Sequence, residues 1–82
     1  MSIVLVLGAD SNLVGEALER AGADGDVIVI DPSALSLEEL ERGAPDPRLW
    51  YQIGDSEIVP LPDGFADQAI GGGSRDVERV LR

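Results

Sequence analysis

Acidic and small residues follow each of three apolar runs, and these are the side chains whose types and spacing are suited to ligand chemistry. Gly8 and Asp10 come after the first run, Asp31 ends the second, and Asp55 and Ser56 follow the third. A carboxylate at the end of a strand accepts hydrogen bonds from two ribose hydroxyls, and glycine lets a ligand approach the backbone closely. The pattern is therefore typical of a nucleotide-type ligand bound at one edge of a sheet.

Each of these residues also fits a purely structural role. Gly8 suits a tight turn between a strand and a helix, and Asp31, which precedes a proline, suits the start of a turn. Asp55 with Ser56 equally fits an ordinary turn in which an aspartate side chain bonds its own backbone. Asp10 is better explained as a loop residue or helix cap than as a catalytic group. No residue stands out as a general base, so the catalytic residues are unknown at this stage.

Strands and helices alternate in the first part of the chain. The aliphatic runs at 3–7 and 27–30 lack polar alternation and predict strands buried on both faces. Between them, apolar residues recur on one helical face, with Ser11 or Asn12 as the cap and Gly22 as the stop.

The second part of the chain continues the same alternation. Ser36 and Glu39 have the spacing of a capping box and predict a short helix beginning at Ser36. Strands are predicted at 49–53 and 65–70. Ser74 is predicted to cap a last helix, whose apolar face is formed by Val77, Val80 and Leu81.

This order of elements predicts an α/β fold with right-handed crossovers and a mostly parallel sheet. We expect a single domain over residues 1–82. Within it, Trp50 and Tyr51 are interpreted as core and rim packing residues.

Composition excludes several classes of function. The 82 residues carry a net charge of −10, with 16 acidic side chains against six arginines, and contain neither cysteine nor histidine. Thiolate and imidazole metal sites are therefore ruled out, and binding to nucleic acid or an anionic membrane is disfavoured. The apolar run at 3–7 is too short to span a membrane and lacks the flanks of a signal peptide. We expect a cytoplasmic protein.

Three stretches resemble the class I S-adenosylmethionine-dependent methyltransferases. IVLVLGADSNLVGEALERAGADGDVIVIDPS is similar to the family's first motif, helix and second strand, and GDSEIVPLPDGFADQAIG is similar to its adenine-contact segment and fourth strand. SRDVERVLR is similar to the helix that follows. The resemblance implies a truncated Rossmann-like sheet of about four strands in the order 3-2-1-4, with about three helices.

The resemblance also assigns roles to the candidate residues. Gly8 matches the first glycine of the S-adenosylmethionine loop, and Asp31 matches the acid that binds the ribose hydroxyls. Asp55 matches the acid beside the adenine amino group, with Ser56 as its neighbour. Asp10 stands where the family has its second glycine, next to the methionine moiety.

The cofactor loop departs from the family pattern of acid-x-Gly-x-Gly-x-Gly. Val6 replaces the acid, and Asp10 and Asn12 replace the second and third glycines, where their side chains would crowd the methionine moiety. A third possibility, a nicotinamide or nucleotide binder, is disfavoured because the Gly-x-Gly-x-x-Gly fingerprint of such a site is absent. Two functions remain open: a non-catalytic methyltransferase-like module, or a minimal methyltransferase that binds S-adenosylmethionine and methylates an unknown acceptor.

Strands five to seven of the family have no counterpart in this chain. The predicted fourth strand, Phe65 to Ile70, would then be an exposed edge with unpaired backbone groups, and the last helix would expose part of its apolar face. A second copy of the chain or another protein would cover both. We therefore expect a homodimer or a partner protein bound through this edge.

Overall fold

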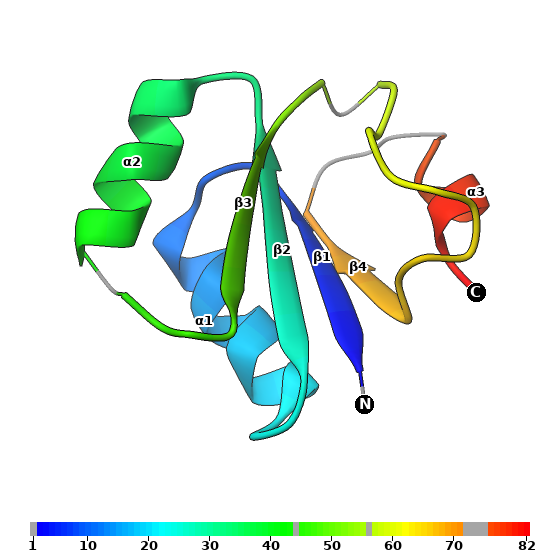
Figure 1. Ribbon diagram of the computed structural model, residues 1–82, viewed down its shortest axis with the longest axis horizontal. Helices are drawn as coiled ribbons and strands as arrows, with labels where there is room; N and C mark the ends of the chain where they lie inside the picture. Colours follow the sequence, from blue (N-terminus) through cyan, green and yellow to red (C-terminus); the bar gives the residue numbers. More distant parts are fainter. Residues whose placement is uncertain (1, 44, 56, 72–75) are drawn as a thin grey trace.

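The computed structural model describes residues 2–43, 45–55, 57–71 and 76–82, which form seven elements (Figure 1). In chain order these are β1 (Ile3–Leu7), α1 (Ser11–Ala21), β2 (Asp26–Asp31), α2 (Ala34–Gly43), β3 (Leu49–Ile53), β4 (Gln68–Ile70) and α3 (Val77–Val80).

The four strands form one sheet in the order β3-β2-β1-β4, and every neighbouring pair is parallel. This confirms the predicted strand order. The register places Leu7 of β1 beside Ile30 of β2, and Asp31 at the end of β2 beside Ile53 of β3. The carboxyl ends of these strands therefore meet at one edge of the sheet, where the candidate residues lie.

Helices α1 and α2 cover one face of the sheet (Figure 1). Alternate residues of each strand point to this face, because successive side chains of a strand lie on opposite sides. The cluster buried beneath the two helices contains Val4, Val6, Val14, Ala17, Ala21, Val27, Val29, Leu37, Leu40, Leu49 and Ile70.

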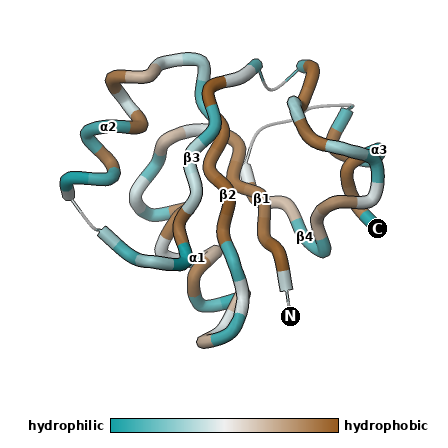
Figure 2. Tube along the Cα trace, viewed as in Figure 1, coloured by the Kyte–Doolittle hydropathy of each residue, from teal (hydrophilic) through white to brown (hydrophobic). Residues whose placement is uncertain are grey.

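The other face is covered only in part, by α3 and the segment that leads to β4 (Figure 1). Its buried cluster contains Leu5, Leu7, Ile30, Val59, Ala66 and Val80. Figure 2 shows that β1 and β2 are hydrophobic along most of their length, which agrees with the prediction of strands that are apolar on both sides.

Part of this second face is open. Trp50 of β3 is 59% exposed, so its interpretation as a core residue was wrong, whereas Tyr51 packs against the helical side as a partly buried residue. Ile28 of the central strand β2 is only partly buried. No helix in the described residues lies over this part of the sheet.

The caps predicted at Ser11 or Asn12 and at Ser36 were wrong by one turn or less, whereas the alternative role of Asp10 as a helix cap is confirmed. Helix α1 is capped by Asp10, not by Ser11 or Asn12, which lie inside the helix. Helix α2 begins at Ala34, and the Ser33 hydroxyl accepts a hydrogen bond from the Ser36 backbone N–H at 3.2 Å. The capping box predicted from Ser36 is therefore a pattern inside the helix, because Ser33 takes the cap position three residues earlier.

The end of the chain also differs from the prediction. Strand β4 is three residues long, and Ala66 instead pairs with Leu81 in an isolated parallel bridge. Of the last helix's apolar face, Val80 is fully buried and only Val77 and Leu81 are partly exposed. The predicted cap at Ser74 lies outside the described residues. Among the described helices, none is long and apolar enough to cross a membrane.

Candidate functional site

Gly8 makes the turn from β1 into the loop that precedes α1. Its φ angle is +110°, a conformation that side-chain-bearing residues rarely adopt, and its N–H donates to the Ile30 carbonyl at 2.8 Å. A Cβ built on Gly8 meets no atom within 4 Å. The requirement for glycine here is therefore conformational, and the space beside the backbone is open.

The Asp31 carboxylate joins the ends of β1 and β2. Its Oδ2 accepts from the Ala9 backbone N–H at 2.9 Å, and its Oδ1 accepts from the Ser33 N–H at 2.8 Å. The first bond holds the loop after β1, and the second shapes the turn that starts α2. Asp31 thus fulfils the turn role that its sequence context allowed, and it also reaches across to the neighbouring strand's loop.

Asp10 is the N-cap of α1. Its Oδ1 accepts from the backbone N–H groups of Asn12 at 2.8 Å and Leu13 at 3.3 Å. These are donors that a helix start leaves without partners. The structure therefore gives Asp10 the cap role that the sequence favoured over a catalytic one.

Asp55 forms a turn with its own chain. Its Oδ1 accepts from the Glu57 N–H at 2.8 Å, and the side chain is exposed. The preceding Gly54 donates its N–H to the Asp31 carbonyl at 3.1 Å, which holds the Asp55 segment beside the end of β2. Ser56 lies outside the described residues.

The structure thus brings the Gly8 loop, Asp31 and the Asp55 segment to one sheet edge, as their spacing predicted. Asp31 contacts the Gly8–Asp10 loop directly through Ala9, and Asp55 is linked to Asp31 through Gly54. Each of the three carboxylates accepts at least one backbone hydrogen bond. No group of three or more acidic residues that could hold a metal ion occurs in the described ranges.

Sequence reasoning missed the clamp formed by Asp76 and Arg79 at the end of the chain. The Arg79 guanidinium bonds both oxygens of Asp76 at 2.8 Å, Asp63 at 2.6 Å, and the carbonyls of Val59 and Leu61. The Val59 N–H donates to Asp76 at 2.7 Å. This network ties α3 to the segment before β4.

The clamp shifts the pKa values of both Asp76 and Arg79. The side-chain bonds from Arg79, followed by the Val59 N–H, lower the pKa of Asp76 to about 2. The bonds from Asp76 and Asp63 raise the pKa of Arg79 above its ordinary value. The i,i+3 spacing of an acid and an arginine was the only signal in the sequence, and it could not reveal the carbonyls that Arg79 reaches 18 and 20 positions away.

Comparison with known proteins supports the resemblance to methyltransferases. The chain is 33% identical over 63 residues to the ubiquinone/menaquinone biosynthesis C-methyltransferase UbiE of Caulobacter vibrioides. The match covers 74% of this chain and 25% of the relative. The same protein from a second strain of that organism matches equally well. No protein-family model matches the chain.

Two solved structures share the fold. One is the complex between the Haloferax volcanii Trm112 methyltransferase activator and a methyltransferase, with a TM-score of 0.69 and 22% identity over 83% of this chain and 30% of that one. The other is an S-adenosylmethionine-dependent methyltransferase from Mesorhizobium loti, with a TM-score of 0.66 and 24% identity over 83% of this chain and 31% of that one.

The four-stranded parallel sheet in the order β3-β2-β1-β4, with its three helices, matches the Rossmann-like fold of these two methyltransferases. Together with the similarity to UbiE, this fold supports a class I S-adenosylmethionine-dependent methyltransferase-like family for the chain. The chain spans 25% of the length of the curated relatives that it matches.

Proposed function

We propose that this chain is a non-catalytic methyltransferase-like module that acts through contacts with other protein chains. The observation that carries the proposal is the internal use of Asp31. In the family this acid binds the ribose hydroxyls, whereas here both of its oxygens hold backbone N–H groups of the chain itself.

The state of the rest of the loop supports the same conclusion. Asp10, in place of a family glycine, directs its side chain back to the α1 N-terminus as a cap. A side chain at this position occupies space that glycine would leave to a ligand. The loop is thus stabilised by hydrogen bonds that come from the chain itself.

The edge of the sheet at β4 supports protein binding. Asp67 donates its N–H to the Ile3 carbonyl of β1. The N–H and C=O groups of successive residues in a parallel strand point alternately to its two neighbours. The N–H and C=O groups of Gln68 and Ile70 therefore point away from β1. Ala66 is satisfied by Val80 and Arg82. For Gln68 and Ile70, the described residues supply no second strand, and such an edge favours pairing with another chain.

The partner at this edge is a second copy of the chain or a different protein. One solved relative of the same fold forms a complex with an activator protein, which is a precedent for protein partners on this scaffold. Pairing of two β4 edges would instead give one continuous sheet from two copies.

The competing function is a minimal methyltransferase that binds S-adenosylmethionine. It is favoured by the open space beside Gly8 and by family membership. The carboxylate of Asp31 retains further lone pairs that ribose hydroxyls could use. For this function, the ribose hydroxyls must donate to Asp31 either beside the Ala9 and Ser33 N–H groups or in place of them.

Thermal unfolding of the wild type and of Asp31→Ala, with and without millimolar S-adenosylmethionine, separates the two functions. A ligand that binds the folded state raises the unfolding temperature, by an amount that grows with its concentration relative to Kd. We expect Asp31→Ala to lower the unfolding temperature and the ligand to shift neither protein. A ligand-dependent rise in the wild type that Asp31→Ala abolishes would support the methyltransferase instead.

A further inference from the structure

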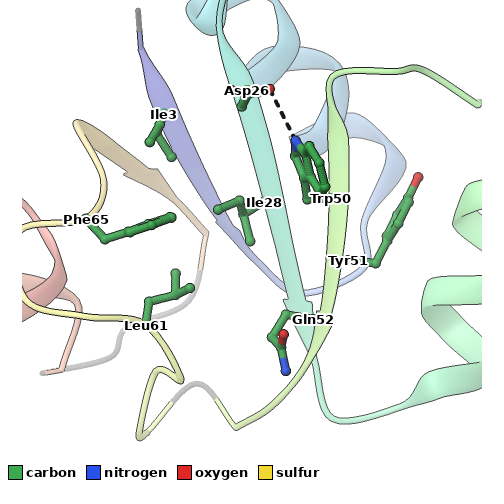
Figure 3. Close-up of a pocket in the computed structure, with 8 residues that line it drawn as sticks. All are labelled: Ile3, Asp26, Ile28, Trp50, Tyr51, Gln52, Leu61 and Phe65. Carbon is green, nitrogen blue, oxygen red and sulfur yellow. Dashed lines mark hydrogen bonds between the residues drawn. The ribbon is translucent and has the colours of Figure 1, made fainter.

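The open part of the second sheet face contains an apolar hollow of about 300 Å³, which we call the sheet-face hollow (Figure 3). Its walls are formed chiefly by Ile3, Ile28, Trp50, Leu61 and Phe65, with Asp26 at the start of β2. In Figure 3, Phe65 and Leu61 extend from the segment before β4 toward Ile3 and Ile28, while Trp50 stands on the opposite side. None of the residues that line it is a candidate residue of the Asp31 edge.

Hydrogen bonds hold side chains or backbone on two sides of the hollow. On one side, the Trp50 indole N–H donates to Asp26 Oδ1 at 3.2 Å, which fixes the ring over the start of β2. On the other side, the Asp76–Arg79 clamp bonds Val59 and Leu61, and thereby positions the Leu61 wall. Large apolar side chains that are partly exposed and gathered in one patch are typical of binding surfaces.

The negative charge around the hollow favours a partner with basic side chains. Asp26 is the charged residue of the lining, and no lining residue is basic. All five arginines in the described part of the chain already pair with acids, namely Arg20 with Glu16, Arg42 with Glu38, Arg48 with Asp46, Arg79 with Asp63 and Asp76, and Arg82 with Asp67. The chain as a whole carries a charge of −10. An apolar occupant with cationic side chains is complementary to this surface.

We propose that the sheet-face hollow docks a basic amphipathic helix of a partner protein, with its apolar stripe on Ile28, Trp50 and Phe65 and a lysine or arginine at Asp26. Parallel sheets are normally covered by helices on both faces, and α1 and α2 both lie on the other one. A second copy of this chain fits less well, because two chains of charge −10 repel each other and the described arginines are already paired. The proposal rests on the proposed function in that both assign the chain a role in protein contacts.

Trp50 is the only tryptophan of the chain, so its fluorescence reports directly on the hollow. The probe is a synthetic helical peptide with a leucine stripe and lysines on its flanks. Its controls are a scrambled peptide of the same composition, which has the charge without the stripe, and a peptide with the same stripe and glutamate in place of lysine. We expect the first peptide to shift Trp50 emission to shorter wavelength and to bind at least about tenfold more tightly than either control.

A pair of variants locates the site. Leu61→Lys changes a wall of the hollow. Leu35→Lys changes a residue that is 64% exposed on α2, the helix that covers the other face of the sheet. With a labelled peptide, we expect Leu61→Lys to weaken binding at least about tenfold and Leu35→Lys to leave it within about twofold of the wild type. Circular dichroism of both variants checks that they are folded, and Asp26→Asn is the substitute test if Leu61→Lys is not.

The proposal is overturned if Trp50 emission does not respond to the amphipathic basic peptide. Equal binding of the scrambled or acidic peptide, or equal loss in the Leu35→Lys variant, would also overturn it. An emission shift that depends on protein concentration alone would assign the hollow to a second copy and reject a basic partner. None of these results depends on whether S-adenosylmethionine binds, so failure here is distinct from failure of the proposed function.

Discussion

Asp31 makes structural hydrogen bonds at the position where the resemblance to methyltransferases implies ribose binding. Its two oxygens accept from the backbone N–H groups of Ala9, in the loop after β1, and Ser33, in the turn after β2. Bonds between a carboxylate and backbone N–H groups are stronger than neutral ones, and a donor left without its acceptor costs more than the bond itself contributes. Asp31 is therefore first a residue that stabilises the fold, by joining the loops after β1 and β2.

Replacing Asp31 by Asn tests this stabilising role. Asn offers one acceptor oxygen and one NH2 group, so either Ala9 or Ser33 loses its acceptor. We expect the free energy of unfolding to fall by about 1–3 kcal/mol. Urea unfolding measures the loss, with Asp55→Asn as the matched control, because Asn at this exposed turn keeps the oxygen that Glu57 uses. Equal stability of both variants would contradict this stabilising role.

Asp10 is expected to contribute as a helix cap. Asp10→Ala removes the acceptor for the Asn12 and Leu13 N–H groups and should cost about 0.5–2 kcal/mol of stability. Asp10→Ser keeps a capping oxygen and should recover most of the loss in thermal unfolding. If Ser were as destabilising as Ala, the capping explanation would be wrong.

The hydroxyl of Tyr51 is buried, and among the described residues it has no hydrogen-bond partner. Burial, followed by the charges of Glu41 and Asp46, raises the pKa of this phenol. Tyr51→Phe removes an unsatisfied polar atom and keeps the ring, so we expect stability to rise by about 1 kcal/mol. A lower urea midpoint for this variant would show that the hydroxyl has a stabilising partner.

At the scale of elements, the Asp76–Arg79 clamp joins α3 to the segment before β4. The pKa of Asp76 is about 2 in the folded chain, against an ordinary value of 3.8. Because the folded value is the lower one, this contribution to stability is complete above about pH 4 and is lost as the pH falls toward about 2. Asp46 is shifted in the same direction by its bonds from Arg48.

Asp76→Asn tests the clamp through this pH dependence. We expect urea midpoints measured at pH 5 and pH 2.5 to differ less for the variant than for the wild type, because the variant has no carboxylate to protonate at this position. The remaining slope comes from the other acids, including Asp46. An unchanged difference between the two midpoints would mean that Asp76 does not link stability to pH.

The elements that could be predicted from sequence were those with strong local patterns. The aliphatic runs predicted β1 and β2. The alternation of strands with helices along the chain predicted that the strands of the sheet are mostly parallel. The caps could not be assigned reliably, because Ser11, Asn12 and Ser36 are as good capping types as Asp10 and Ser33, and only backbone geometry selects among them. The short β4 and the pairing of Ala66 with Leu81 depend on contacts between distant residues.

The candidate site was predictable in position but not in function. Topology alone brings Gly8, Asp31 and Asp55 to one edge, and the sequence predicted this. The side chains' partners are backbone N–H groups of neighbouring loops, such as Ala9 for Asp31, and no pattern of residue types reveals which donor a carboxylate will meet. The exposure of Trp50 could not be predicted either, because it depends on which distant segments cover the sheet.

At the scale of the whole molecule, the open β4 edge makes a prediction for hydrogen exchange. At low protein concentration the amides of Gln68 and Ile70 should exchange faster than that of Ala69, which faces β1. If a second copy pairs at this edge, their protection should rise with concentration. Strong protection of Gln68 and Ile70 at every concentration would show that the edge is already covered within the chain.

Calorimetric titration with S-adenosylmethionine and with its demethylated product tests most directly whether this methyltransferase-like fold acts without a cofactor. We expect no heat of binding for either compound up to millimolar concentration. Binding of one molecule per chain with low-micromolar affinity would contradict this expectation, and would mean that the Asp31 carboxylate still accepts a ribose.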